Sequence, residues 1–309
     1  MKHFINLKDI PASDLRKIIN DAKKRKIKRI FFNTLDVDKD TPLKGKLLIQ
    51  MFEKSSLRTR LSFYLALKQL GGGTITLRAN ELHLGKNGES LADTARILST
   101  YGDGFMLRTD SDKKIEEFRK HLTIPIINGL SPSSHPTQVL SDVFTVEEIK
   151  KKPISKLNIC WIGDSNNVLN SLIAASVKFK FKLNIGCPKN YAPEKFILNW
   201  AKKYKGKITI FNDAKKAATN ADVIFSDKVI SLNDKVNKVK KIRDFKNFKI
   251  NSKLIGFAKR DVIFLHCLPR GTEVSNEVFL GKKSKVWQQA LNRVHVQKSI
   301  LLYSFGKLR

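Results

Sequence analysis

Short apolar runs that end in polar clusters are the feature of this sequence that most constrains its fold. The runs at 47–51, 159–162 and 262–265 are almost continuously apolar, which is typical of strands buried in a parallel sheet. Segments with helical patterning separate them, as in β-α-β units. In open sheets of this kind, ligands bind at the carboxyl ends of the strands. The polar residues that follow each run are therefore the first candidates for a functional site.

The run at 262–265 ends in the cluster His266-Cys267-Leu268-Pro269-Arg270. An imidazole, a thiol and a guanidinium at a strand end suggest a site for an anionic or carbonyl substrate. Pro269 interrupts the backbone, which leaves the carbonyls of Cys267 and Leu268 available to a ligand. The same cluster also fits a strand end with an inert buried thiol and a solvated arginine.

A second polar cluster, at 52–60, follows the run at 47–51 and leads into a helical segment that ends at Gly71-Gly72-Gly73. Ser55 or Ser56 is suited to cap this helix. Backbone N–H groups, two hydroxyls and Arg58 would then converge on one point, which suits a phosphate group. An ordinary capped helix with exposed arginines is the alternative.

A third cluster, Ser134-His135-Pro136-Thr137-Gln138, opens another helix. Proline suits the first helical position, so His135 stands at the cap and Gln138 lies one turn inside. A histidine at a helix N-terminus tends to stay neutral, and its ring N–H is then able to donate to a carbonyl oxygen. A structural role is the alternative for a histidine of this kind.

Together these clusters resemble motifs of the aspartate/ornithine carbamoyltransferase family, which has a Ser-Xaa-Arg-Thr-Arg turn and a His-Pro-Xaa-Gln helix start. The His-Cys-Leu-Pro form of the third motif is similar to the ornithine branch. Further matching segments run through the chain in family order: His83-Leu84-Gly85, Glu89 to Arg96, Gly163 to Val168, Asp227 with Ser231, and Asn292-Arg293.

The resemblance implies an α/β fold of two Rossmann-like domains with mostly parallel sheets and an active site in the cleft between them. We expect a carbamoyl-phosphate-binding domain at 1–149 and an ornithine-binding domain at 150–309. The last helix, at about 292–305, is expected to pack back on the first domain. The length of 309 residues agrees with two domains of about 150 residues each.

The resemblance also implies residue roles. In carbamoyl phosphate binding, Ser56, Arg58, Thr59 and the N–H of Leu57 would hold the phosphate. Arg108 would reach the phosphate and the carbonyl oxygen, which His135 and Thr59 would polarise. Gln138, Arg293 and the carbonyls of Cys267 and Leu268 would fix the carbamoyl NH₂. His83 would reach the site of a neighbouring subunit, so the active sites of a homotrimer would be shared.

Ornithine would bind through Asn167, Asp227, Ser231 and the backbone at Leu232, and Cys267 would orient its neutral δ-amine. Arg58, Arg108, His135 and Cys267 are thus the expected catalytic residues. This sequence departs from the family pattern in the closing loop, residues 227–233, which lacks the usual Trp and Gly. Acetylornithine, putrescine and aspartate therefore remain alternative amine acceptors.

Composition limits the remaining possibilities. The start of the chain shows no signal peptide and no apolar run reaches the length of a membrane span. The three cysteines have no CxxC spacing and are odd in number, which favours a reducing, cytoplasmic setting. Histidine and cysteine spacing indicates no metal, and the absence of a GxGxxG motif indicates no nucleotide, so no cofactor is expected.

The net charge of +31 fits this account least well. It is compatible with a non-catalytic protein that binds nucleic acid through phosphate contacts. The basic residues are spread along the whole chain, however, and no aromatic interleaving or helix-turn-helix pattern accompanies them. A lysine-rich solvated surface is the favoured explanation, with some steering of an anionic substrate.

Overall fold

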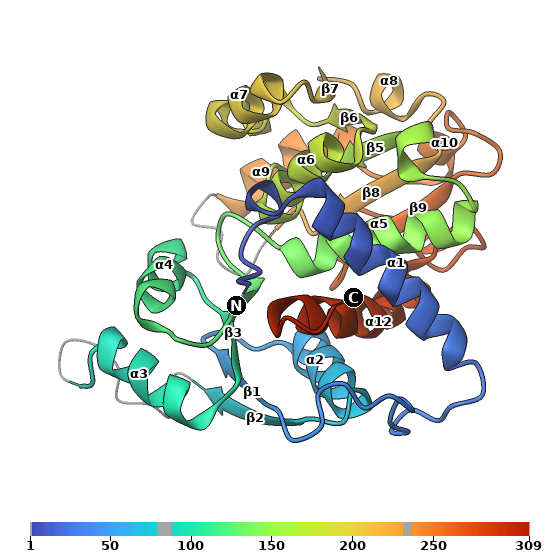
Figure 1. Cartoon of the computed structure of the whole chain (residues 1–309). Helices are drawn as coiled ribbons and strands as arrows, with labels where there is room; N and C mark the ends of the chain where they lie inside the picture. Colours follow the sequence, from blue (N-terminus) through green and yellow to red (C-terminus); the bar gives the residue numbers. More distant parts are fainter. Residues whose placement is uncertain (1, 79–87, 231–236, 309) are drawn as a thin grey trace. The chain divides into compact units, whose positions relative to one another are not determined.

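The chain folds into two α/β units, as the computed structural model shows for residues 2–78, 88–230 and 237–308. Unit 1 comprises residues 1–144 and 290–309, and unit 2 comprises residues 145–289. Figure 1 shows both units, with helices and strands labelled where there is room. Among the described residues, no helix is long and apolar enough to cross a membrane.

Unit 1 is built on a four-stranded parallel sheet in the order β2-β1-β3-β4. Its strands are β1 (Leu47–Phe52), β2 (Gly73–Arg78), β3 (Gly104–Arg108) and β4 (Ile126–Leu130). Its helices are α1 (Ala12–Lys28), α2 (Leu57–Gln69), α3 (Leu91–Tyr101) and α4 (Asp112–His121), together with most of α5 (Pro136–Lys150) and α12 (Val286–Ser304).

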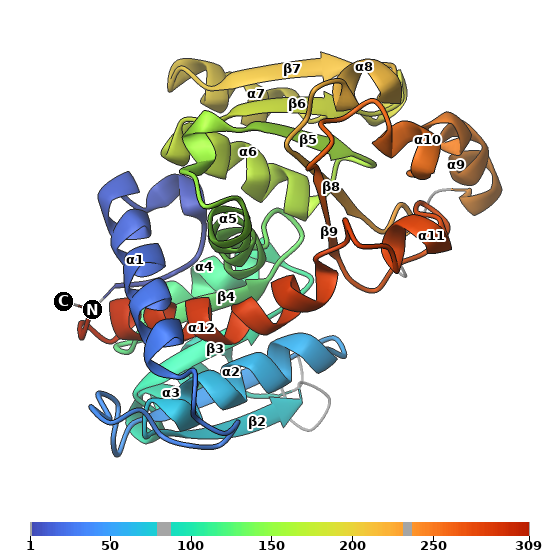
Figure 2. The ribbon, with the colours of Figure 1, turned by 90° about the vertical axis from the view of Figure 1, so that its right-hand side faces the viewer.

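Side-chain alternation along the strands gives the unit 1 sheet two buried faces. On one face, Ile49, Met51, Phe105 and Leu107 pack with residues of α3 and α4 in a single apolar cluster. Figure 2 shows α2 and α12 lying along the other side of the sheet. Because both faces are covered, the strands carry the continuous apolar runs that identified them in the sequence.

Unit 2 has a five-stranded parallel sheet in the order β7-β6-β5-β8-β9. The strands are β5 (Asn158–Ile162), β6 (Lys182–Gly186), β7 (Lys207–Phe211), β8 (Val223–Asp227) and β9 (Ile263–Cys267). The helices are α6 (Asn167–Phe179), α7 (Lys195–Lys203), α8 (Ala214–Ala218), α9 (Lys238–Asp244), α10 (Ser252–Ile255) and α11 (Asn276–Phe279).

The strand order of unit 2 reverses beside β5, which is the point where an open parallel sheet binds ligands at its carboxyl edge. Here β5 runs into the start of α6, and its neighbour β8 ends at Asp227. On β9, Cys267 is the register partner of Asp227. Three polar segments that are distant in sequence therefore meet at one edge.

The expected α/β class with parallel sheets is confirmed. The last helix begins at Val286, six residues before the predicted Asn292, because apolar Val286 is fully buried and joins a core cluster of unit 2. Residues from Ala290 onward belong to unit 1.

Candidate active site

The turn after β1 leads directly into α2, so the start of this helix lies at the carboxyl edge of the unit 1 sheet. Ser56 occupies the N-cap position, but its hydroxyl accepts no hydrogen bond from the first turn, unlike the cap that the sequence suggested. The first N–H groups of an α-helix have no acceptor within the helix, and this end carries partial positive charge. Both properties favour an anion at Leu57, Arg58 and Thr59.

The side chain of Thr59 is fully buried in unit 1, and two arginines converge on its hydroxyl. Its Oγ1 accepts a hydrogen bond from Arg293 Nη2 at 2.8 Å and a longer one from Arg108 Nη1 at 3.4 Å. These residues come from α2, α12 and the end of β3. The structure thus gathers three predicted carbamoyl-phosphate residues that lie far apart in the sequence.

Arg293 also binds the helix that begins at Pro136. Its Nη1 donates to Gln138 Oε1 at 2.7 Å, and Gln138 Nε2 donates in turn to Asp142 Oδ1 at 2.8 Å. Arg293 and Gln138 are almost completely buried. The chain of hydrogen bonds fixes the rotamer of each group, which is the kind of preorganisation that a catalytic site needs.

His135 is buried beside the same cations. Burial, reinforced by the positive charges of Arg293, Arg108 and Arg58, holds the pKa of His135 well below its ordinary value. The imidazole is therefore neutral at physiological pH and has one N–H to donate. Three guanidinium groups around a neutral donor form an environment that favours a multiply charged anion.

Glu53 ties the turn after β1 to the end of β3, where Arg108 lies. Its backbone N–H donates to the carbonyl of Arg108 at 3.0 Å, and its carboxylate accepts from Thr109 Oγ1 and from Lys114 Nζ at 2.6 Å. No role for Glu53 was predicted from the sequence. Its position in the segment 52–60 was the signal that could have identified it.

In unit 2, Asn166 joins the start of α6 to the end of β8. Its Oδ1 caps the helix by accepting from the N–H groups of Val168 and Leu169, and its Nδ2 donates to Asp227 Oδ2 at 2.8 Å. Asn167, predicted to bind ornithine, is the first residue of that helix. The cap therefore holds Asn167 and Asp227 at the same sheet edge.

Burial raises the pKa of Asp227 to about 6, although His266, the N–H of Lys228 and Asn166 act in the opposite direction. Near neutral pH the carboxylate is mostly ionised, yet it is poorly hydrated. An isolated buried carboxylate costs free energy that a cationic ligand would offset. An α-ammonium group is a ligand of that kind.

Glu273 organises the loop that follows Cys267, a role that the sequence analysis missed. Its Oε1 contacts His266 Nε2 at 3.1 Å and accepts from the N–H of Gly271 at 2.6 Å, and its Oε2 accepts from the N–H of Val229 at 3.4 Å. These contacts tie the segment after Cys267 to the segment after Asp227. No local pattern links Glu273 to His266 in the sequence.

Three predicted residues, His83, Ser231 and Leu232, lie outside the described residues. Within the described ranges, no group of three or more His, Cys, Asp or Glu side chains is arranged to hold a metal ion. The cysteines form no disulfide, and Cys160 and Cys187 are buried while Cys267 is partly exposed.

Known proteins are similar to this chain in sequence and in fold over nearly its whole length. The family model of the carbamoyl-P binding domain of aspartate/ornithine carbamoyltransferases matches residues 2–148, and that of the Asp/Orn binding domain matches residues 155–304. Ornithine carbamoyltransferase of Rhodopseudomonas palustris is 41% identical over 99% of this chain and 97% of its own length. That of Agrobacterium fabrum is 38% identical over 99% and 98%.

Solved structures agree with the sequence matches. Ornithine carbamoyltransferase from Pyrococcus furiosus has a TM-score of 0.92 and 37% identity, covering 100% of this chain and 98% of that one. Anabolic ornithine carbamoyltransferase from Campylobacter jejuni has a TM-score of 0.90 and 35% identity, with both chains covered completely. On the strength of both family models and of these relatives, the chain belongs to the aspartate/ornithine carbamoyltransferase family.

Proposed function

We propose that the protein transfers the carbamoyl group of carbamoyl phosphate to the δ-amine of L-ornithine, which yields L-citrulline and phosphate. The observation that carries the proposal is the group around Thr59, where Arg108 and Arg293 converge beside a buried, neutral His135. The arginines suit the phosphate, and the neutral imidazole suits the carbonyl oxygen as it gains negative charge.

In the reaction, the δ-nitrogen of ornithine forms a bond to the carbamoyl carbon while the bond from that carbon to the phosphate oxygen breaks. The proton that leaves the amine goes to the departing phosphate, so charge and atoms balance without a cofactor. Ser56, the N–H of Leu57 and Arg58 would bind the phosphate, and Gln138 with Arg293 would orient the carbamoyl group. Positioning and fixed charge account for most of the acceleration in this scheme.

The acceptor side of the proposal rests on unit 2. Asp227 would bind the α-ammonium group of ornithine, Asn167 would contact the same end of the amino acid, and Cys267 would face the δ-amine. The register pairing of Asp227 with Cys267 and the pKa of Asp227 support this assignment. Ser231, Leu232 and His83 complete the proposed site by resemblance to the family.

Incubation of the purified protein with carbamoyl phosphate and ornithine tests the proposal. Citrulline and phosphate should appear in equal amounts, and an Arg58→Ala protein purified in the same way should form both about a thousandfold more slowly. Phosphate release without citrulline would contradict the proposed transfer.

Cys267→Ser is expected to leave carbamoyl phosphate affinity within about twofold and to raise KM for ornithine about tenfold, since the thiol faces the amine. Steady-state kinetics with each substrate varied in turn will measure both effects. A loss of carbamoyl phosphate binding with unchanged ornithine KM would assign the thiol to the other substrate.

We also propose that the protein is a homotrimer that works in arginine biosynthesis in the cytoplasm. An exposed apolar stripe on α2 supports the assembly: Leu57, Leu61 and Tyr64 lie on one face of the helix and are 73%, 49% and 42% exposed. Exposed apolar stripes of this kind commonly mark protein interfaces. The stripe begins at the phosphate-binding turn, so an interface there would place a second subunit beside the site.

Leu61→Asp should therefore convert a species of about three chains into single chains of 35.2 kDa and remove activity, because a buried charge disfavours the interface. Sedimentation equilibrium will report the mass, with Val239→Asp on α9, where the side chain is 77% exposed, as the matched control. A Leu61→Asp protein that keeps its assembly would exclude the α2 stripe as the interface.

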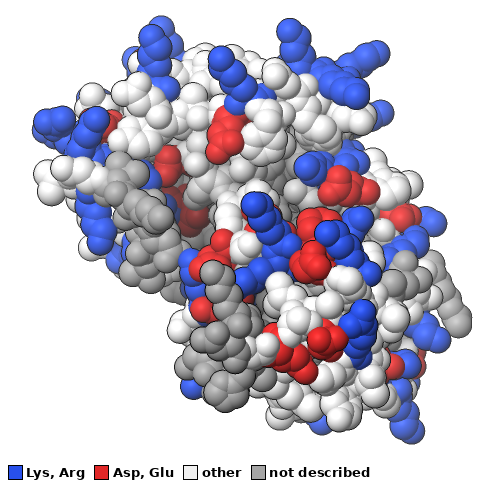
Figure 3. All heavy atoms as spheres, turned by 90° about the vertical axis from the view of Figure 1, so that its left-hand side faces the viewer, with Lys and Arg blue, Asp and Glu red and all other residues white. Residues whose placement is uncertain are grey.

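The net charge of +31 supports no second function strongly enough to displace this one. Figure 3 shows lysines and arginines scattered over the face in view, with carboxylates among them. Nucleic acid binding would require affinity that falls steeply with salt concentration. Salt-dependent nucleic acid binding by a protein that forms no citrulline would favour the non-catalytic, nucleic-acid-binding alternative.

A further inference from the structure

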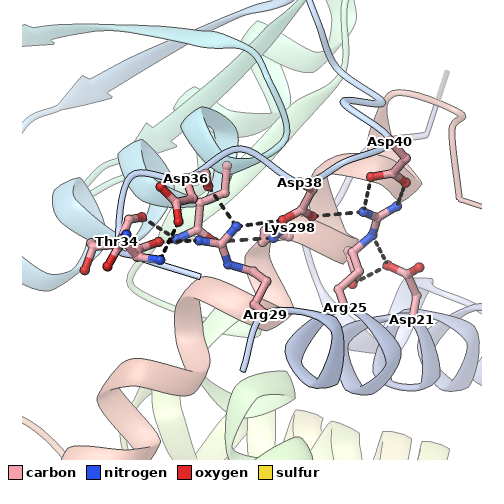
Figure 4. A network of polar contacts seen from close by, with 11 residues as sticks. Asp21, Arg25, Arg29, Thr34, Asp36, Asp38, Asp40 and Lys298 are labelled. Atoms are coloured by element: carbon pink, nitrogen blue, oxygen red, sulfur yellow. Dashed lines mark hydrogen bonds and ion pairs between the residues drawn. The ribbon is translucent and has the colours of Figure 1, made fainter. Parts of the chain in front are cut away.

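A cluster of charged side chains surrounds the C-terminal half of α12 in unit 1 (Figure 4). Lys298 Nζ donates to Asp38 Oδ1 at 2.6 Å and to Gln69 Oε1 at 3.3 Å. The next residue of the helix, Ser299, donates through Oγ to Asp21 Oδ2 at 2.6 Å. Two successive residues of α12 are thus tied to three segments of the unit: the loop that holds Asp38, helix α2 and helix α1.

Two arginines complete the cluster. Arg29 Nη1 donates to Asp38 Oδ1 at 2.9 Å, and Arg25 donates to Asp38, Asp21 and Asp40 at 2.9–3.1 Å. Three carboxylates therefore balance the three cations Arg25, Arg29 and Lys298. Asp38 and Asp21, which accept from Lys298 and Ser299, are themselves held in place by these arginines. Arg25 lies in α1, and Arg29 directly follows that helix.

The burial of Lys298 argues that the cluster serves geometry more than stability. Its side chain has no exposed surface and that of Asp38 is 9% exposed. Burial lowers the pKa of Lys298 to about 8, although Asp38 acts to raise it. A buried ion pair is often no more stabilising than apolar residues of the same volume, but its directional contacts restrict how the parts fit together.

Lys26 of α1 makes a third tie to α12. Its Nζ donates to Asn292 Oδ1 at 2.7 Å, and Asn292 is fully buried. Successive residues of an α-helix point about 100° apart and rise 1.5 Å. Asn292 and Ser299, seven positions apart, therefore face nearly the same direction, and Lys298 faces about 120° away from Asn292. The ties at these residues span about 10 Å of helix and act from two directions, which fixes both its rotation and its axial position.

Arg293 lies inside this fixed stretch and must reach two acceptors at once, Thr59 and Gln138. A rotation of α12 by one residue would swing its guanidinium through about 100° and away from both. We propose that Lys26, through Asn292, and Lys298, through Asp38, are positioning residues that aim Arg293 into the carbamoyl phosphate site. This inference rests on the proposed function of that site.

The variants Lys26→Met and Lys298→Met test the proposal, because each removes an ammonium group and retains most of the side chain's volume. In Lys298→Met, Asp38 keeps both arginines, so no buried charge is left alone. Each variant should lower kcat/KM for carbamoyl phosphate about tenfold to a hundredfold, as expected when a catalytic group is misplaced. The KM for ornithine at saturating carbamoyl phosphate should stay within about twofold, and the urea midpoint of unfolding should not fall.

Two controls separate positioning from general stability. Lys24→Met, on an exposed part of α1, should match the wild type, and Lys26→Arg should recover most of the activity because it keeps a donor. In an Arg293→Ala background, Lys298→Met should have almost no further effect, since a residue that acts through Arg293 cannot add to its loss.

The inference would be overturned by unchanged kcat/KM in the two lysine variants, or by fully additive losses in the double variant. Citrulline formation by the wild type would leave the proposed function intact in either case. An inactive wild type that also fails to bind carbamoyl phosphate by calorimetry would instead overturn the proposed function. If Lys298→Met does not fold, Ser299→Ala and Lys26→Met decide the matter by the same measurements.

Discussion

Arg58→Ala is expected to lower kcat/KM for carbamoyl phosphate by about three orders of magnitude, the size of effect known for loss of a donor to developing negative charge. Arg58 is the second residue of α2 and contributes to the positive field that depresses the pKa of His135. Its loss removes a charge that no nearby backbone N–H replaces. Steady-state kinetics with carbamoyl phosphate varied at saturating ornithine will measure the effect.

Arg96→Ala is the matched control, because this arginine is 65% exposed in its side chain and pairs only with its helix neighbour Asp93 among the ion pairs of the described residues. The control should keep wild-type kinetics, and both variants should keep the wild-type circular dichroism spectrum. Near-normal activity of a folded Arg58→Ala protein would remove Arg58 from the phosphate site.

Asp227→Asn is expected to weaken binding of the amino acid about a hundredfold or more, because it removes the negative charge that would face the α-ammonium group in the proposed site. Carbamoyl phosphate affinity should be unchanged. Norvaline, which has the ornithine backbone without the δ-amine, isolates this part of recognition. Calorimetric titration of norvaline in the presence of a carbamoyl phosphate analogue will measure the change.

The same experiment has a defined pH dependence. Burial raises the pKa of Asp227 to about 6, so the carboxylate is protonated as pH falls through that value and loses its attraction for the ammonium group. Norvaline affinity should therefore decline below about pH 6 in the wild type. An Asp227→Asn protein with the same acid decline would show that another group causes it.

The strands were the most predictable part of the fold. The apolar runs at 47–51 and 159–162 lie within strands β1 and β5. The run at 262–265 begins one residue before β9. Burial on both faces of a parallel sheet makes such runs continuous, so the pattern is strong. Helices α8, α10 and α11 were not predicted, since segments of four or five residues carry too few turns to show a helical period.

Candidate site residues were predictable where they lie beside a strand end or a helix start. Pro136 indicated His135 and Gln138, and the end of a strand indicated Cys267, whereas Asp227 was predicted by resemblance to the family. The meeting of Arg293 with Thr59 was not predictable from local pattern, because 234 positions separate them and tertiary packing alone brings them together. Lys26 and Glu273 were missed for the same reason.

The most direct test of the proposed reaction compares kcat/KM for ornithine, acetylornithine, putrescine and aspartate, each with saturating carbamoyl phosphate and the same preparation of protein. The proposal predicts that ornithine exceeds every other acceptor by at least about a hundredfold, because Asp227 and Cys267 match its α-ammonium and its δ-amine. A higher value for any of the other three amines, or no product with any of the four, would contradict it.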